Sequence, residues 1–166
     1  MITVTENGHP LTYTFDDLMK YHGPGFPGGV AHAYQALQRA LLELDDGTGI
    51  ERREITINTP FAGPGARDAF EMVTRAVTGD RYHVRPELAL PERGYLLERY
   101  VFTVAYRERE TTVILRDAGF VVPEFIDLAR KQGRTEAEES RLTVLKQEMA
   151  DRLLARPATE VYDVAQ

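Results

Sequence analysis

Apolar side chains recur every three or four residues over much of the chain, and this period predicts amphipathic helices. The strongest example is 28–44, where one apolar face runs along the whole segment. Further helices are predicted over 15–21, 66–78 and 135–155. Another helix is expected to begin at Pro123, because proline suits the first turn of a helix.

Four shorter segments alternate apolar and polar residues, as strands with one buried face do. The clearest is 98–107, and 110–116 follows it closely enough to pair with it as a hairpin. The segments 53–58 and 81–85 are predicted as two more strands. This order of elements favours an α+β fold, with a small mixed or antiparallel sheet and helices packed on one face.

Two of the predicted helices start with the residues of a capping box. Thr14 precedes Asp17 at the required spacing, and Thr135 precedes Glu138 in the same way. In another predicted helix, Asp68 falls in the first turn, where the helix dipole favours a negative charge. These residues predict where three helices begin.

The chain of 166 residues is predicted to form one domain over 1–166, with a single core. The segment 86–97 contains two prolines and a glycine and is expected to be a loop or an insertion. The C-terminal helices are predicted within 123–155, and Val161 and Tyr162 after them are candidate docking residues. The sequence contains no internal repeat and no low-complexity block.

Composition excludes several classes of protein. The formal net charge of −6, with basic residues scattered among acids, argues against nucleic-acid binding. No apolar run approaches the ~20 residues of a transmembrane helix, and the first residues lack the pattern of a signal peptide. We therefore expect a cytoplasmic protein without membrane contact. Because the chain has no cysteine, disulfides, thiolate nucleophiles and cysteine-bound zinc are excluded.

The segment 22–29 is the strongest candidate for a functional site. It places His22 before a loop dense in glycine and proline that leads into the predicted helix 28–44. A second loop of the same kind, 59–65, leads into the next predicted helix. Helix N-termini present unpaired N–H groups, so each loop could bind an anion or a carbonyl group. Alternatively, glycine and proline serve here only as ordinary loop residues.

Two histidines and one carboxylate are the candidates for chemistry at these loops. His22 could act as a general base or a metal ligand, or be a packed scaffold residue. His32 lies off the apolar stripe of its helix, and helix folding could bring it back towards the loop. Asp68 could face His22 or only stabilise its own helix. The predicted ligand-binding residues are His22, Gly23, Phe26, Gly28, His32, Gly65 and Asp68.

No complete catalytic motif accompanies these candidates. The P-loop, the nucleophile elbow Gly-x-Ser-x-Gly and the zinc motif His-Glu-x-x-His are all absent. Gly23, Gly25 and Gly28 match a dinucleotide-binding pattern formally, but no predicted strand precedes them and two prolines remove donors. The residues by themselves therefore specify no reaction.

Four segments of the chain, in the same order, resemble the E-subunit family of formylmethanofuran dehydrogenase. Members of that family carry His-Gly-His-x-Cys-Pro-Gly before a helix, and residues 22–28 read His-Gly-Pro-Gly-Phe-Pro-Gly. The family's Cys-Gly-x-Asp-Ala is similar to residues 65–69, Gly-Ala-Arg-Asp-Ala. Its strand Ala-Phe-Thr-Phe-Tyr-Asn and its ending Leu-Leu…Pro…Leu-Phe-Asp-Val resemble residues 101–107 and 153–164.

The resemblance implies an α+β fold of the kind shared with the C-terminal domain of glyceraldehyde-3-phosphate dehydrogenase, and a homodimer. It also implies a metal held by a histidine and two cysteines. This chain has Phe26 and Gly65 in place of the cysteines, and Pro24 in place of the family's second histidine. Only His22 carries over as a ligand for a divalent metal such as zinc, with Asp68 beside it.

Three functions follow as hypotheses. The first is a small-ligand-binding or accessory protein whose degenerate metal site has become a pocket between the loops 22–29 and 60–68. The second is an enzyme in which His22 acts as general base or metal ligand together with His32 and Asp68. The third is a structural partner in a larger complex.

Overall fold

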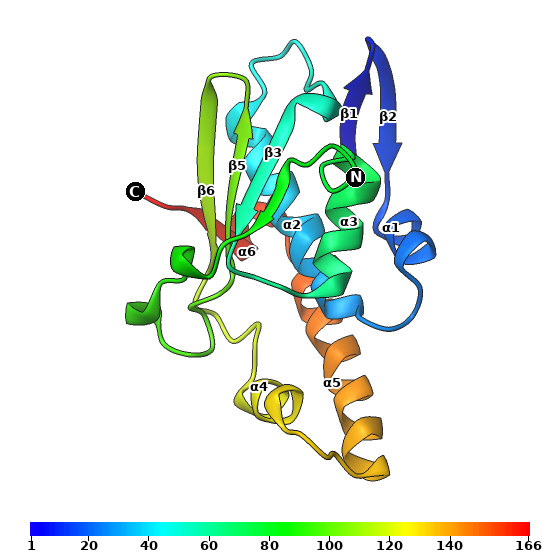
Figure 1. Cartoon of the computed structure of the whole chain (residues 1–166), viewed down its shortest axis with the longest axis vertical. Coiled ribbons are helices and arrows are strands. Elements are labelled where there is room, and N and C mark those ends of the chain that lie inside the picture. Colours follow the sequence, from blue (N-terminus) through cyan, green and yellow to red (C-terminus); the bar gives the residue numbers. More distant parts are fainter.

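The computed structural model describes residues 1–166, and Figure 1 shows the arrangement of its elements. The strands are β1 (Ile2–Glu6), β2 (His9–Tyr13), β3 (Ile55–Thr59), β4 (Tyr82–Val84), β5 (Val101–Tyr106), β6 (Arg109–Leu115) and β7 (Tyr162–Val164). The helices are α1 (Phe15–His22), α2 (Pro27–Leu44), α3 (Pro64–Thr74), α4 (Pro123–Arg130), α5 (Glu136–Leu154) and α6 (Ala158–Val161). Short 3₁₀ turns are η1 (Arg52–Glu54), η2 (Pro86–Leu88) and η3 (Pro91–Arg93).

These elements form an α+β fold, as the sequence predicts. The main sheet has the strand order β4-β3-β5-β6-β7, and β1 and β2 form a separate hairpin. β3 and β4 are parallel and are joined through α3, whereas the other neighbouring strands are antiparallel. On one face of the sheet Ile57, Val104 and Val113 are completely buried, and α2 packs there against β5, β6 and β7.

The first three turns of α2 are buried on all sides. Besides the sheet, α2 contacts α1, α3 and α5, and every residue from Pro27 to Leu37 is buried. The apolar stripe predicted from the sequence is confirmed, but the opposite side is not a polar surface at this end of the helix. His32 and Gln35 lie there and are 0% and 3% exposed, because α5 covers them.

The start of α3 differs from the prediction in a way that matters for Asp68. The helix begins at Pro64 instead of residue 66, with proline in the first turn and no side-chain cap. Asp68 therefore lies in the second turn, and its predicted place in the first turn is wrong. The helix ends at Thr74, because Arg75 adopts the left-handed conformation (φ 56°).

One of the two predicted capping boxes is complete. Thr14 accepts a hydrogen bond from the amide of Asp17 (3.2 Å), and the Asp17 carboxylate accepts one from the amide of Thr14 (2.9 Å). At the start of α5, Thr135 accepts from the amide of Glu138 (3.1 Å), but the Glu138 carboxylate is bound by Lys131 instead (2.7 Å). The second box is therefore only half formed.

Three strands near the two ends of the chain were not predicted. β1 and β2 pair around Asn7 and Gly8, which both have positive φ (50° and 80°), as the type I′ turn of a hairpin requires. His9 is the first residue of β2. β7 adds Tyr162 to the edge of the sheet beside Leu115, and its ring is completely buried.

α4 and the first turns of α5 extend away from the sheet at the lower end of Figure 1. α2 and α3, which contact each other, both begin in the middle of the molecule, on the side that faces α4 and α5. The apolar stripe predicted for α5 is confirmed, since Leu142, Leu145, Met149 and Leu153 are all buried. None of the helices combines the length and the apolar character that crossing a bilayer requires.

Candidate functional site

The two Gly/Pro loops singled out in the sequence meet in space, because α2 and α3 begin side by side. A Cβ atom added to Gly65 would lie 2.5 Å from the carbonyl oxygen of Phe26, and one added to Gly29 would lie 3.2 Å from the amide nitrogen of Ala66. Only glycine allows such a close approach of two backbones. The packing of α2 on α3 thus accounts for these glycines without any ligand.

A cavity of about 390 Å³ opens between the two loops and the α4–α5 arm. Three of the predicted site residues, Phe26, Gly28 and Gly65, lie in its wall. The other residues that line it are Gly29, Phe61, Gly63, Pro64, Phe125, Ala129, Arg134, Glu139, Leu142, Lys146 and Met149. Its size is typical of small-molecule sites, which range over roughly 300–1,000 Å³.

His22 and Asp68 form a hydrogen-bonded pair beside this cavity, although neither lines it. His22 is the last residue of α1, and its Nδ1 lies 2.7 Å from Oδ2 of Asp68 on α3. An ionised carboxylate can only accept, so Nδ1 carries the hydrogen. The His22 side chain is only 7% exposed, and its Nε2 is buried without a hydrogen-bond partner. An imidazole oriented in this way can act as a base or a ligand through Nε2.

The surroundings of His22 connect the pair to the cavity wall. Its ring lies 5.8 Å from the ring of Phe26, measured between centroids. Gly25 lies against Nε2, at a distance where an added Cβ would make ordinary contact (4.0 Å). Gly23 ends α1 with φ 88° and donates its N–H to the carbonyl of Met19 (2.7 Å), which explains this glycine by helix termination.

His32 belongs to the core and does not join His22. It is 0% exposed, and its ring stacks on Tyr100 at 4.2 Å between centroids. Its Nε2 lies 3.4 Å from Sδ of Met149, and its Nδ1 lies 2.7 Å from the hydroxyl of Tyr162. Because the sulfur can only accept, Nε2 carries the hydrogen and the Tyr162 hydroxyl donates to Nδ1. Burial lowers the pKa of His32 from 6.5 to about 3, so the ring is neutral.

The side chains present do not fit the metal that the family resemblance implies. The structure contains no group of three or more histidine and carboxylate side chains arranged to hold a metal ion. Phe26 and Gly65, which the resemblance aligns with the family's cysteines, offer no donor side chain. His22 has Asp68 as its one ionisable partner, through Nδ1.

The charged groups at the cavity come from α5 and the turn before it, and none of them was predicted from the sequence as part of a site. Arg134 and Glu139 form an ion pair at 2.8 Å, and Lys146 lies 4.1 Å from the centroid of the Phe26 ring. Burial lowers the pKa of the Lys146 ammonium group. One signal in the sequence could have indicated that Lys146 is partly buried. It stands one helical turn before Met149, which belongs to the apolar stripe of the same helix.

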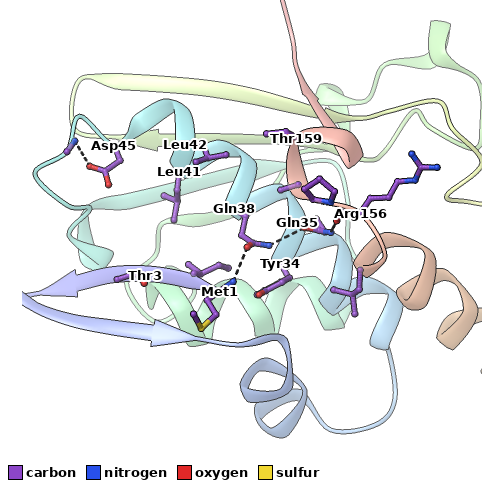
Figure 2. Close-up of a pocket in the computed structure, with 15 residues that line it drawn as sticks. Met1, Thr3, Tyr34, Gln35, Gln38, Leu41, Leu42, Asp45, Arg156 and Thr159 are labelled. Atoms are coloured by element: carbon purple, nitrogen blue, oxygen red, sulfur yellow. Dashed lines mark hydrogen bonds between the residues drawn. The ribbon is translucent and has the colours of Figure 1, made fainter.

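A larger and more open cavity of about 800 Å³ lies on the other side of α2, lined by residues at the start of the chain and by 154–159. Figure 2 shows that its polar groups already bind one another. The amine of Met1 donates to Gln38 (3.2 Å), Gln38 donates to Gln35 (3.1 Å), and Gln35 donates to the carbonyl of Arg156 (2.8 Å). This cavity contains none of the predicted site residues, and its glutamines hold the end of α5.

Two comparisons with known proteins identify no relative of this chain. No protein-family model matches the sequence, and a search of curated proteins finds no significant match. The resemblance to the E-subunit family of formylmethanofuran dehydrogenase therefore stays a prediction from the motifs of the sequence.

Proposed function

We propose that this chain is a small-ligand-binding protein, a divergent relative of the E-subunit family of formylmethanofuran dehydrogenase with a degenerate metal site. One observation carries the proposal: the loops 23–29 and 59–65, far apart in the sequence, border one cavity of about 390 Å³. The α+β fold and the order of the motifs support the family assignment. The family's metal has no replacement ligands here, so the site binds its ligand through the cavity wall.

The aromatic residues of the cavity give it an apolar interior, which suits an organic ligand better than a hydrated ion. Phe26 belongs to this wall and stands where the family has a cysteine. His22 and Asp68 lie behind Phe26 and fix its surroundings through their hydrogen bond. The buried Nε2 of His22 offers one polar contact to a ligand group that reaches past Gly25.

A cavity-blocking variant tests this proposal. Ala129 is exposed at the cavity, so Ala129→Trp is expected to fill the space without disturbing the core. Ala137, exposed in the first turn of α5 and outside the cavity, provides the matched control Ala137→Trp. In a thermal-shift screen of small organic molecules, wild type and control should share ligands that the blocked variant has lost. Ligands that bind all three proteins equally contradict the site.

A second function, an enzyme with His22 as general base, is supported by the pairing of its Nδ1 with Asp68 and by its free Nε2. His22→Asn keeps a donor near the position of Nδ1 and removes Nε2. Turnover of p-nitrophenyl esters or phosphates that disappears in this variant, with the fold intact, would favour the enzyme. Zinc, iron and nickel well below one equivalent in protein purified without a tag would exclude its metal-dependent form.

The homodimer implied by the resemblance is also part of this proposal. The sheet face opposite α2 carries the partly exposed residues Thr56, Thr103, Ala105 and Thr112, with the carboxylates of Glu110 beside Ala105 and of Asp163 beside Ile114. A twofold interface brings each patch against its own copy, so a chain with net charge −6 associates best around the uncharged centre of this face, at Thr103 and Thr112. Light scattering should give a dimer that Thr103→Arg converts to a monomer. A wild-type monomer at high concentration contradicts the dimer, and the cytoplasmic location stays a prediction.

A further inference from the structure

The interior of the 390 Å³ cavity is apolar, and this limits the body of any ligand. Rings of Phe26, Phe61 and Phe125 line it, and Leu142 and Met149 lie in its wall. A polar or highly charged ligand would lose its hydration on entering such surroundings and would find no hydrogen bonds there to compensate for the loss. An apolar or aromatic group is therefore the part of a ligand that the cavity can accept.

Lys146 is the unusual charge of this cavity. The chain has three lysines, and Lys20 and Lys131 each lie within ion-pair distance of a carboxylate (3.8 and 2.7 Å). Lys146 forms no ion pair with a carboxylate. Its contacts are the face of the Phe26 ring and a long hydrogen bond to the carbonyl of Gly25 (3.4 Å). The acid that acts on it from the same cavity, Glu139, is already paired with Arg134. A partly buried ammonium group without an ion pair of its own favours an anionic partner.

The other charges at the cavity are already compensated. Arg134 binds Glu139 (2.8 Å) and also donates to the carbonyls of Leu128 (3.1 Å) and Lys131 (2.9 Å). The two cations and one carboxylate of the lining thus leave one positive charge, that of Lys146. The first turns of α2 and α3 line the same space without an acidic residue and add a weak positive potential.

We propose that the cavity binds a monocarboxylic acid with an apolar or aromatic body, its carboxylate on Lys146 and its body among Phe26, Phe61 and Phe125. A single negative charge matches the one uncompensated cation, whereas a phosphate dianion would also meet the carboxylate of Glu139. This inference rests on the proposed function, because it names the class of ligand for the same cavity.

Three probes of nearly equal shape separate charge from bulk: 3-phenylpropionate, 3-phenylpropanamide and 3-phenylpropan-1-ol. Isothermal titration calorimetry with wild-type protein should give a preference of roughly tenfold for the acid over both neutral probes. Lys146→Met keeps the length of the side chain and removes its charge, so the acid should lose this advantage while the neutral probes bind as before. Lys20→Met, at an exposed lysine that does not line the cavity, should keep the preference.

Equal binding of acid and neutral probes by wild type, or an unchanged preference in Lys146→Met, overturns the assignment of a carboxylic acid. Neutral ligands that bind wild type and are blocked by Ala129→Trp would then leave the proposed function in place. If Ala129→Trp changes the binding of no molecule at all, the proposed function and this inference both fail. The blocked variant therefore tells the two failures apart.

Discussion

His22 and His32, ten residues apart in the sequence, differ in how many of their ring nitrogens have a hydrogen-bond partner. Both side chains are more than nine-tenths buried. His32 has partners for both ring nitrogens, Tyr162 and Met149. His22 has one partner, Asp68, and its Nε2 has none.

The difference teaches how a structural histidine is distinguished from a candidate functional one. Burial alone does not separate them. A buried polar atom is normally paired, so a complete set of partners indicates a role in the fold. An unpaired nitrogen costs stability, and a protein retains it more readily where the atom has another use. By this criterion His32 holds the core together, whereas His22 is a candidate for a functional site.

The largest expected effect is the loss of stability in His32→Asn. The smaller side chain leaves space beside Tyr100 and weakens the bond to Tyr162, so the free energy of unfolding should fall by about 3 kcal/mol. Urea denaturation of the variant and of wild type measures this. A loss below about 1 kcal/mol would mean that His32 is no more structural than a surface residue.

A smaller effect is expected from pH. The pKa of His32 is about 3 in the folded protein and 6.5 in its ordinary state, so the unfolded chain takes up a proton first as pH falls. The stability is complete above pH 6.5 and declines towards pH 3, by roughly 2 kcal/mol between pH 6.5 and 5. In His32→Asn this decline should be absent over that window, which lies above the ordinary pKa of carboxylates. Equal slopes for the two proteins contradict the neutral, buried ring.

A matched pair of tyrosines tests the partners of His32. Tyr162→Phe removes the donor to Nδ1 and should reduce the free energy of unfolding by about 1.5 kcal/mol. The hydroxyl of Tyr82 is also buried but has no partner, so Tyr82→Phe should leave stability unchanged or raise it slightly. Thermal unfolding of both variants makes the comparison. A larger loss for Tyr82→Phe would mean that the bond to His32 is not what makes Tyr162 structural.

The smallest effect is expected for His22→Asn. Because the amide still donates to Asp68 and the unpaired nitrogen is gone, only the space left by the smaller side chain costs stability, and the free energy of unfolding should fall by no more than about 1 kcal/mol. Ligand binding that depends on Nε2 should nevertheless weaken in the same variant. Urea denaturation and calorimetry, applied together, check both parts. A loss of stability as large as that of His32→Asn would remove the distinction between the two histidines.

Much of the fold follows from local patterns in the sequence. The period of apolar residues, together with the capping box at Thr14, predicts α1 and α2 to within one residue at each end. The hairpin of β1 and β2 was missed although Asn7-Gly8 is the strongest short signal for such a turn. β7 is only three residues long, which is too short to show an alternating pattern. Its pairing depends on β6, which is remote in the sequence.

The candidate site was predicted in part. The two Gly/Pro loops do meet, and His22 does face Asp68. The opposite wall of the cavity could not be predicted, since Lys146 reaches Phe26 only through the packing of α5 on α2. The same packing buries His32. The apolar stripe of its own helix predicts that His32 faces solvent, because it lies on the opposite side from the stripe.

The bond between His32 and Tyr162 also has a consequence for the synthesis of the chain. The two residues are separated by 130 positions, which a ribosome needs roughly 6 to 26 seconds to add. During that interval the imidazole of the nascent chain has no hydroxyl to bind, and α2 lacks the strand and helix that later enclose it. The N-terminal part therefore keeps some of its apolar surface exposed to solvent until residue 162 has been synthesised. We expect a chaperone to bind the nascent chain mainly during this interval.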